Sequence, residues 1–577
     1  MPLTFLDYCK IVQQIAETRG NNSKISIFAD FLKSIENEQE LELAVQFTGE
    51  GAFSTVSGRR ASVGSRTIAE TACRFCEIDY ERVFRPCKTA TGSASEAIEK
   101  LTANLDQAVR KRSPDSPALP EMKSFYEELA SARNRNEKES LMHGLWPYLT
   151  PLEIKFSLRV LSQGSLRIGF ESRSIVAAIA KAFDQDTEKV RYTYMLTGSI
   201  GRTALLSYNN ELETAEFRLF QPVSFMLASP LESNEPDDAQ SYLAEEKLDG
   251  MRCQLHAQGT DISLFSRDLN DITTAFPDVV DQIRMQQPEA TVMDGELCVF
   301  RDDVIGTFND LQQRMGVKKP SKKLLEEFPV RFVAFDLLYA DNAPQFDQPL
   351  ETRRTRLAEI CRKLELPVTR QRKIDNPSDI KTMFAEAIAR GNEGLMLKKM
   401  TGVYEYGQRK KSWLKLKQPG GSFDTVIMYA HAGSGRRGGT YSDFTLGIRV
   451  ADDGRYEEEF IPIGKAYGGY SNKELDQLNK EIRKLAVDRF GPTLSLKPGI
   501  VVEIEFDEIQ PNPRTKAGYT LRFPRFRAIR WDLDPTDCDT LWDVEHQYQE
   551  RTTLKETAEN RNEALILMDS LKSESFH

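Results

Sequence analysis

The sequence predicts a multidomain protein with a helical region first, a mixed α+β region second and a β-rich region last. Its 577 residues correspond to about three or four domains. Apolar residues follow helical spacing up to about residue 220, and an alternation typical of strands takes over after that point. The break Gln418-Pro419-Gly420-Gly421 then separates two regions that both contain predicted strands.

The first region, residues 1–220, is predicted to be all-α. Thr150, Pro151 and Glu153 combine an N-cap, a proline at the first helical position and an acid at the third, which is a strong start signal for a helix. Apolar residues then recur on one helical face. We therefore expect a helical domain that ends before the strand-like alternation begins.

Two glycine-bearing basic turns interrupt these predicted helices, at residues 164–169 and 197–202. Glycine permits close approach of the backbone, and a helix N-terminus offers N–H groups to a phosphate. The same turns could instead be plain helix ends. Their spacing alone favours the plain helix ends over a phosphate site.

The second region, residues 221–418, is predicted to be α+β. Apolar and polar residues alternate in several of its segments, while others have helical spacing. The predicted strands are 253–257, 291–300 and 331–339, and the predicted helix is 381–390.

The third region, residues 419–550, is predicted to be a small β-barrel. Four strand-like runs and one helical stretch, Ser471–Val487, suit a Greek-key barrel of the OB type. The runs are 425–429, 444–450, 460–463 and 500–506. Residues 551–577 are expected to form a polar helix or a loose tail.

Composition excludes several classes of protein. Hydrophobic residues make up 40% and charged residues 28%, which is a globular composition and not that of a disordered chain. The mean hydropathy is -0.47 and no apolar run reaches about 18 residues, so we expect no membrane span. The N-terminus lacks the pattern of a secretory signal, and the eight cysteines are scattered. We therefore expect a cytoplasmic protein, associated with the nucleoid if the source is bacterial.

The net charge of -10 argues weakly against a nucleic-acid partner. Basic residues nevertheless cluster in two places. Residues 406–417 hold five cations and no acid, and residues 509–531 hold six cations and no acid. These segments predict local positive surfaces on an acidic background.

One cysteine cluster resembles a metal site in its spacing. Cys73 and Cys76 are three apart, and Cys87 follows eleven residues later. A structural zinc ion needs four ligands, and no further cysteine or histidine lies nearby in the sequence. We therefore interpret the pair as residues on the apolar face of a helix.

A series of short motifs carries the predicted chemistry. Lys247 stands before Asp249-Gly250, which by itself is weak evidence, because a lysine at this place could be an exposed turn residue. The motifs that follow make the signal specific. They are Ser266-Arg267-Asp268, Asp294-Gly295-Glu296, Ala334-Phe335-Asp336, Glu393-Gly394-Leu395-Met396-Leu397-Lys398, Arg409, Trp413-Leu414-Lys415-Leu416-Lys417 and Leu521-Arg522-Phe523-Pro524-Arg525-Phe526.

Together these segments resemble, in order, the six motifs of the covalent nucleotidyltransferases, and specifically those of ATP-dependent DNA ligases. The turn Leu166-Arg167-Ile168-Gly169 and its flanking helices are similar to the helical DNA-binding domain of larger ligases. Segments 441–445 and 464–467 suggest a bacterial type. The resemblance implies a DNA-binding domain at 1–220, an adenylation (nucleotidyltransferase) domain at 221–418 and an OB-fold domain at 419–550.

The resemblance implies three successive transfers. Lys247 would attack ATP and form a Lys247–AMP phosphoramidate, with pyrophosphate leaving. AMP would then move to the 5′-phosphate of a nick in duplex DNA, and the 3′-hydroxyl would expel it as the strand is sealed. A free lysine is nearly all protonated at neutral pH, so the site must release its proton.

The resemblance also assigns residues to ATP and metal. Glu245 would lie beside the adenine and Phe335 would stack on it, although Phe335 could also be a buried strand residue. Glu296 and Glu393 would hold Mg²⁺, with Mn²⁺ left open, because hard cations prefer oxygen ligands. Ribose and phosphate contacts would come from Arg252, Arg267, Glu296, Lys398, Arg409, Lys415 and Lys417.

DNA contacts are expected from all three domains, mostly to phosphates and without sequence preference. Arg522 and Arg525 would also orient pyrophosphate, or they could only bind DNA. The expected DNA-contacting residues are Arg167, Arg202, Arg436, Arg437, Arg522 and Arg525.

The match departs from the family in small ways. Asp268 stands where many relatives carry asparagine, and the chain shows no peptide of the sliding-clamp-binding type, so we expect a monomer that needs no clamp. Two alternatives remain open: an RNA ligase or capping guanylyltransferase on the same scaffold, and a non-catalytic nick-binding protein. A preference for GTP or nicked RNA would favour the first, and nick binding without AMP transfer would favour the second.

Overall fold

A computed structural model describes residues 2–566 except 106–115, 163–165, 232–235, 237, 302, 406–408, 419, 434–439, 451–453, 557 and 559. The chain divides into two compact units, and each consists of two stretches of sequence. Residues 1–215 and 419–548 form the first unit, and residues 216–418 and 549–577 form the second. No helix in the described part is long and apolar enough to cross a membrane.

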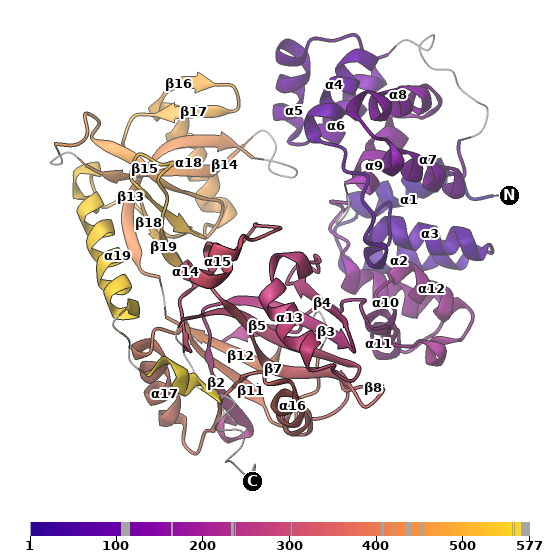
Figure 1. The fold of residues 1–577 in the computed structure, drawn as a ribbon. Coiled ribbons are helices and arrows are strands. Elements are labelled where there is room, and N and C mark those ends of the chain that lie inside the picture. The colour runs from indigo at the N-terminus through magenta and orange to yellow at the C-terminus, as the bar shows by residue number, and fades with distance from the viewer. Residues whose placement is uncertain are drawn as a thin grey trace. The chain divides into compact units, whose positions relative to one another are not determined.

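The N-terminal stretch of the first unit is helical, drawn in indigo to purple in Figure 1. Its helices are α1 (Phe5–Glu17), α2 (Asn21–Lys33), α3 (Glu38–Gly49), α4 (Ser65–Phe75), α5 (Arg85–Thr91), α6 (Ala94–Ala103), α7 (Leu119–Ser131), α8 (Arg135–Leu145), α9 (Pro151–Leu161), α10 (Ser172–Ala182), α11 (Thr187–Thr197) and α12 (Ile200–Tyr208). All of them except α5 contribute side chains to one apolar core.

The start signals in the sequence act as predicted in this helical stretch. The backbone N–H of Glu153 donates to the Thr150 hydroxyl, and the Glu153 side chain accepts from the Thr150 N–H at 2.7 Å, which completes a capping box. Cys73 lies in α4 and Cys76 directly follows it, and both side chains are buried. The Cys73 side chain packs into the helical core, as the helix-face interpretation predicts.

The C-terminal stretch of the first unit is β-rich. It contains β13 (Ser422–Ala432), β14 (Tyr441–Arg449), β15 (Phe460–Ala466), α18 (Asn472–Leu485), β16 (Ala486–Phe490), β17 (Thr493–Leu496), β18 (Val501–Glu505), β19 (Glu508–Pro511), β20 (Tyr519–Arg522), β21 (Arg525–Arg530) and the first part of α19 (Leu541–Glu556). The residues of α19 from 549 onward belong to the second unit. In the described part, the order β15-β14-β13-β17-β16 forms an open path, and β18 joins β13 to β21.

This β-rich stretch differs from the sequence prediction at one end of its helix. The predicted helix Ser471–Val487 ends at Leu485, and the chain turns directly into the hairpin β16–β17. Val487 is 64% exposed. The apolar Val487 continues the helical spacing in the sequence. In the structure, residues 486 and 487 lie instead in β16, which pairs with β17.

The second unit contains two sheets and their covering helices. Its elements are β1 (Leu227–Pro230), β2 (Tyr242–Lys247), β3 (Met251–Gln258), β4 (Asp261–Ser266), α13 (Pro277–Met285), β5 (Thr291–Arg301), β6 (Val304–Ile305), α14 (Phe308–Gln312), α15 (Lys322–Glu327), β7 (Val330–Ala340), β8 (Ala343–Pro344), α16 (Leu350–Leu364), β9 (Val368–Thr369), β10 (Gln371–Lys373), α17 (Pro377–Ala389), β11 (Gly394–Lys399), β12 (Arg409–Lys417) and β22 (Leu565–Ile566).

The strand order of these two sheets places the motifs. Within the described residues, one sheet runs β1-β12-β11-β2-β10 and the other runs β22-β9-β7-β5-β3-β4. The predicted strands 253–257, 291–300 and 331–339 lie in β3, β5 and β7, at the centre of the second sheet. Most of the motifs therefore lie on or directly beside central strands of these two sheets, whereas Ser266-Arg267-Asp268 ends the edge strand β4 and Leu521–Phe526 lies in the first unit. The short strand β22 adds an edge to the second sheet.

Candidate active site

Lys247 is the last residue of β2, where the chain leaves the first sheet. Its ammonium Nζ lies 2.7 Å from Oε2 of Glu393, which directly precedes β11. The two residues are neighbours because β2 and β11 pair antiparallel with Lys247 opposite Gly394, and the Glu393 N–H donates to the Lys247 carbonyl. Lys417, from the end of β12, contacts the same Glu393 oxygen at 2.6 Å. A lysine–glutamate–lysine cluster therefore stands at one end of the first sheet.

The charges in this cluster shift one another's ionisation. Burial alone would lower the pKa of Lys247, but the negative charges of Glu393 and Glu296 outweigh burial and raise it. Burial would raise the pKa of Glu393, yet the ammonium groups of Lys247 and Lys417 hold it at about 2. Burial raises the pKa of Glu296 to about 7, against the opposing pull of Lys247 and Arg252. Without ligand, Lys247 is therefore an ammonium held by Glu393.

The negative charges of the two predicted metal ligands, Glu296 and Glu393, both act on Lys247. Glu296 lies in β5 of the second sheet, and Glu393 directly precedes β11 of the first sheet. No group of three or more His, Cys, Asp or Glu side chains suited to a metal occurs among the described residues. Mg²⁺ is commonly held by one or two carboxylates together with substrate phosphates, and not by an all-protein cage. The donor set of two glutamates fits that mode.

The pairing of β2, β10 and β11 buries the carboxylate of Glu245. Glu245 is 3% exposed and lies opposite both Gln371 and Met396 in the sheet. Its Oε2 contacts Lys398 Nζ at 2.7 Å, and its Oε1 accepts a hydrogen bond from the Gln371 amide at 2.5 Å. Both carboxylate oxygens are thus held by donors, which fixes their orientation.

One aromatic ring from each sheet lies beside Lys398: Phe335 from β7 of the second sheet and Trp413 from β12 of the first. The Lys398 ammonium lies 4.3 Å from the ring centre of Phe335 and 4.5 Å from that of Trp413. The two rings are 6.0 Å apart and edge-on. Burial lowers the pKa of Lys398, although Glu245 and Asp336 pull it upward. Phe335 is 9% exposed, so its ring is largely buried, beside a buried carboxylate and a buried cation.

Arg252 is held in the second sheet by several partners at once. Its guanidinium donates to Asp294 at 2.9 Å and to the Met226 carbonyl at 2.7 Å. It also packs over the rings of Phe225 and Phe335, at 4.6 and 5.5 Å from their centres. The Arg252 side chain is 18% exposed. Arg252, the predicted ribose contact, therefore packs its cation against Phe335, the residue that is predicted to stack on adenine.

The other predicted ATP residues are placed less tightly. Arg267 is exposed in the turn after β4. Lys415 lies in β12 opposite Met396 of β11. Arg409 starts β12 and pairs through its backbone with Leu227, but its side chain lies outside what the structure describes.

The basic turn at 166–170 is anchored to the helical core by three buried side chains and by one hydrogen bond. Leu166, Ile168 and Phe170 are each at most 2% exposed, so alternate residues point into the core. The buried Lys24 donates to the Ile168 carbonyl at 2.6 Å. Arg167 has a positive φ of 58° and is exposed. The turn therefore presents the Arg167 side chain outward on a rigid base.

The second basic turn is less available to phosphate. Arg202 is exposed in the first turn of α12, but the N-cap hydroxyl of Ser199 accepts from its N–H at 3.4 Å. The carboxylate of Glu50 accepts from the backbone of Ile200. Glu50 therefore occupies donors that the sequence interpretation had left for a ligand.

The predicted DNA contacts in the β-rich stretch are ion-paired. Arg522 lies 3.5 Å from Glu508, and Arg525 pairs with Glu505. Arg436 and Arg437 lie outside the described residues. The two described arginines are exposed by 38% and 56%, so each could exchange its glutamate for a phosphate.

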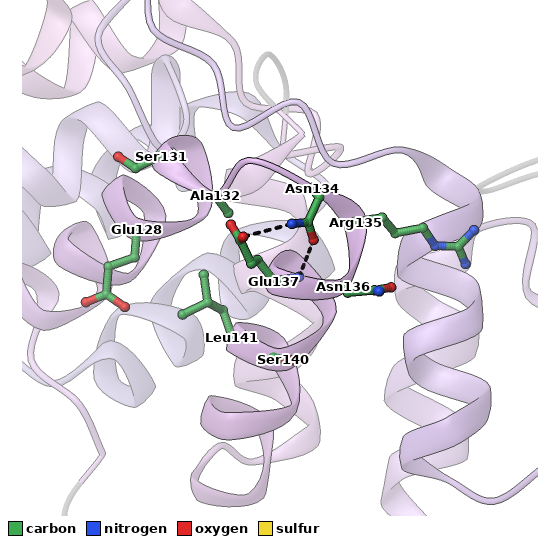
Figure 2. A pocket seen from close by; sticks show the side chains of 9 residues that line it. All are labelled: Glu128, Ser131, Ala132, Asn134, Arg135, Asn136, Glu137, Ser140 and Leu141. Atoms are coloured by element: carbon green, nitrogen blue, oxygen red, sulfur yellow. Dashed lines mark hydrogen bonds between the residues drawn. The ribbon is translucent and has the colours of Figure 1, made fainter.

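A large surface hollow lies in the helical stretch, between α7 and α8. Figure 2 shows Asn134 and Glu137 pointing toward each other at its edge. The Asn134 side chain accepts from the Glu137 N–H at 3.0 Å and donates to the Glu137 carboxylate at 2.8 Å. The N-terminus of α8 is thus capped by its own residues, and the hollow offers no donor set comparable to the Lys247 cluster.

Sequence patterns did not point to several residues of the site. Gln371 orients Glu245 from 126 residues away, and nothing near it in the sequence forms a motif. Tyr404 donates its hydroxyl to Asp294 at 2.6 Å and thereby supports Arg252. Of these supporting residues, only Trp413 lies in a segment that the sequence marks, because it stands in the basic motif with Lys415 and Lys417.

Three family models match the chain. One described as "DNA ligase N terminus" matches residues 4–180, one described as "ATP dependent DNA ligase domain" matches 225–417, and one described as "ATP dependent DNA ligase C terminal region" matches 437–533. The middle match includes Lys247, Glu296, Glu393 and Lys417. The matched segments follow the order of the sequence motifs.

Two curated relatives align over nearly their whole length. A "Probable DNA ligase" of Koribacter versatilis is 32% identical, over 93% of this chain and 95% of the relative. A "DNA ligase" of Archaeoglobus fulgidus is 29% identical, over 94% and 98%. A solved structure described as "Pmar-Lig_PreS3" aligns with a TM-score of 0.58 and 16% identity, over 91% of this chain and 99% of that one, which bears on the fold alone.

Proposed function

The chain belongs to the ATP-dependent DNA ligases and seals nicks in duplex DNA, and we propose that it does so through a covalent Lys247–AMP intermediate. The observation that supports this most directly is that the Lys247–Glu393–Lys417 cluster and the contacts of Lys398 with Glu245 and Phe335 lie in the same unit. The proposed nucleophile, lysines that can neutralise phosphate charge, and an aromatic ring beside a carboxylate therefore stand together in that unit.

The first step forms one bond and breaks one. The Lys247 amine attacks the α-phosphorus of ATP, an N–P bond forms, the bond from that phosphorus to the bridging oxygen breaks, and pyrophosphate leaves with both electrons. The lysine must lose a proton before or during attack. Since Lys247 is an ammonium held by Glu393 in the absence of ligand, we propose that this contact is exchanged when ATP binds.

Phe335 supports the adenine, and Glu245 selects it in this proposal. A carboxylate accepts hydrogen bonds and does not donate them, so Glu245 suits the amino group of adenine better than the carbonyl oxygen of guanine. Lys398 and Gln371 hold both of its oxygens in place. Arg252 and Arg267 contact the ribose and phosphate side.

Glu296 and Glu393 are proposed to hold Mg²⁺, with Mn²⁺ as a possible substitute. When bound, the ion would polarise the oxygens of the reacting phosphate and offset its charge. Lys415, Lys417 and Arg409 would neutralise the remaining phosphate charge, in keeping with a reaction that depends on positioning and electrostatics.

The remaining two transfers use the DNA. AMP passes from Lys247 to the 5′-phosphate at the nick, and the 3′-hydroxyl then attacks that phosphate and releases AMP. We propose that residues 1–220 grip the duplex as a monomer and without a clamp, that residues 221–418 adenylate, and that residues 419–550 form an OB-type barrel. Phosphate contacts would come from Arg167, Arg202, Arg436, Arg437, Arg522 and Arg525.

Labelling with α-³²P-ATP and Mg²⁺ tests the proposal. We expect an acid-labile label on the wild-type chain, discharged by nicked duplex DNA with sealing, and no label on Lys247→Ala. A label on Lys247→Ala would contradict the assignment of the nucleophile. Labelling only by GTP, or discharge only on nicked RNA, would indicate a different polynucleotide or nucleotide substrate.

A further inference from the structure

The last described residues of the chain, 560–566, pack against the second unit, near the residues that flank Lys247. We define the C-terminal clasp as Lys555 together with residues 560–566. The three matched family segments end at residues 180, 417 and 533, so the clasp lies beyond all of them. Its contacts reach the residues on both sides of the nucleophile.

The first contact is apolar. Ala564 and Leu565 are each 1% exposed and share a small core with Leu248, the residue directly after Lys247. The other members of that core come from the second sheet and its edge: Cys298, Phe300, Ile305 and Val333. A side chain adjoining the nucleophile is therefore packed in part by the C-terminal clasp.

The second contact is ionic and acts on the residue directly before Lys247. Glu563 accepts from Arg390 at 3.0 Å, and the same guanidinium donates to Glu246 at 2.6 Å. Asn392 donates to the other Glu246 oxygen at 2.8 Å. Arg390 thus bridges the clasp to β2, and the Glu246 side chain is only 9% exposed.

The third contact is with the turn that follows Lys247. The Lys555 ammonium lies 2.8 Å from a carboxylate oxygen of Asp249. Asp249 is 10% exposed, and Lys555 is 31% exposed. This ion pair joins the end of α19 to the loop that separates β2 from β3.

The fourth contact reaches Glu245. Leu565 and Ile566 pair with β9, and the Arg370 N–H donates to the Ala564 carbonyl at 2.8 Å. The next residue, Gln371, donates to Glu245. The clasp therefore holds the segment that orients the predicted adenine-selecting carboxylate.

From these four contacts we propose that the C-terminal clasp is a positioning element for the transfer of AMP to Lys247. It fixes Glu245, Glu246, Leu248 and Asp249, the residues that surround the nucleophile along the chain. This inference rests on the proposed role of Lys247. Misplacement of reacting groups by about 1 Å can slow a reaction about 100-fold, so a loosened β2 end should slow adenylation before it affects DNA.

A comparison of two truncated chains tests the proposal. One ends at Asn560 and lacks the strand of the clasp, and the other ends at Ile566 and keeps it. We expect the chain ending at Asn560 to form Lys–AMP at least about tenfold more slowly at saturating ATP, and the chain ending at Ile566 to match the full chain. Both rates are measured by single-turnover labelling with α-³²P-ATP.

The same chains are tested on nicked DNA that already carries AMP on its 5′-phosphate. Sealing this substrate needs no attack by Lys247, so we expect the chain ending at Asn560 to seal it nearly as fast as the full chain does. An equal loss in both assays would mean that the segment only stabilises the fold, and it would overturn the proposal. The proposal would also be overturned if the chain ending at Asn560 formed Lys–AMP as fast as the full chain does.

Point variants separate the individual contacts. Glu563→Gln and Lys555→Met should slow labelling, and Lys555→Arg should restore it because the charge opposite Asp249 is kept. Leu554→Ala is the matched control, since Leu554 is 62% exposed beside Lys555 and should label normally. If Lys247→Ala were labelled, the proposed function itself would fail. Normal labelling of all clasp variants with an inactive Lys247→Ala would reject the clasp alone.

Discussion

At the residue scale, Lys247, the proposed nucleophile, forms an ion pair with Glu393. Glu393 is shared by Lys247 and Lys417 through one oxygen. The two ammonium groups lower the pKa of Glu393, and Glu393 in turn raises the pKa of Lys247. In the mechanism that we propose, the charges of bound ATP rearrange these contacts before Lys247 attacks.

A second buried acid, Glu50, predicts a pH dependence in the helical stretch. Burial raises its pKa to about 7, although hydrogen bonds from Ile200 and Thr55 act in the opposite direction. An acid with a raised pKa stabilises the folded state most at low pH, and this contribution disappears as pH rises through the folded pKa. We expect α3 and α12 to lose up to roughly 3 kcal/mol of local stability between about pH 5 and about pH 8.

Hydrogen exchange of the α3 and α12 amides in the full chain measures this effect. Glu50→Gln keeps the acceptor oxygen for the Ile200 N–H but removes the charge, so protection should exceed that of the wild type above neutral pH and approach it in acid. Equal protection of the two chains near about pH 8 would show that Glu50 does not titrate as the structure indicates.

At the element scale, the close approach of strands determines where side chains can be added. A Cβ at Gly250, in the turn between β2 and β3, would lie 2.6 Å from the Leu297 carbonyl oxygen and 2.7 Å from Cγ of Glu296. No ordinary side chain fits there without moving β5. The turn after Lys247 therefore needs glycine for space, because β3 and β5 are paired at this point.

Gly250→Ala should slow Lys247–AMP formation by about tenfold or more, because the added methyl group pushes Glu296 and the β2 end apart. Overpacking of this kind costs about 1–3 kcal/mol of folding stability. Gly144→Ala is the control: it lies in α8 with no atom within 4 Å of the new Cβ and should be neutral or stabilising. Normal labelling by Gly250→Ala would contradict the expected contact.

At the scale of the whole molecule, the helical core and the surroundings of Lys247 belong to different units. The helical core is formed by residues of the N-terminal stretch, while the cores around Lys247 are formed by residues of the second unit. The second unit consists of residues 216–418 and 549–577, and we propose that it carries out the adenylation step. AMP transfer to Lys247 should therefore not require residues 1–215.

A chain of residues 216–577 should keep Lys247–AMP formation and lose affinity for nicked DNA by about 100-fold or more at physiological salt, because phosphate contacts dominate such binding. Labelling and fluorescence anisotropy with a nicked duplex measure the two properties separately. Unchanged DNA affinity in this chain would show that the helical stretch does not grip the duplex.

Local signals in the sequence were enough to predict much of this protein. Helix starts such as Thr150–Glu153 depend on residues a few positions apart, and strand alternation in β3, β5 and β7 depends on a period of two. The order of the motifs indicated the family, and the motifs themselves pointed to Lys247, Glu296 and Glu393 as site residues. These patterns are visible because their physical causes act over short distances along the chain.

Only the tertiary structure decided which distant residues support the site. Gln371 meets Glu245 through strand register, Tyr404 meets Asp294 through packing, and Glu563 meets Arg390 through a strand that returns from the end of the chain. Each contact joins residues more than 100 positions apart. Pairing and packing over such separations depend on the register and fold of the whole unit, so no local pattern records them.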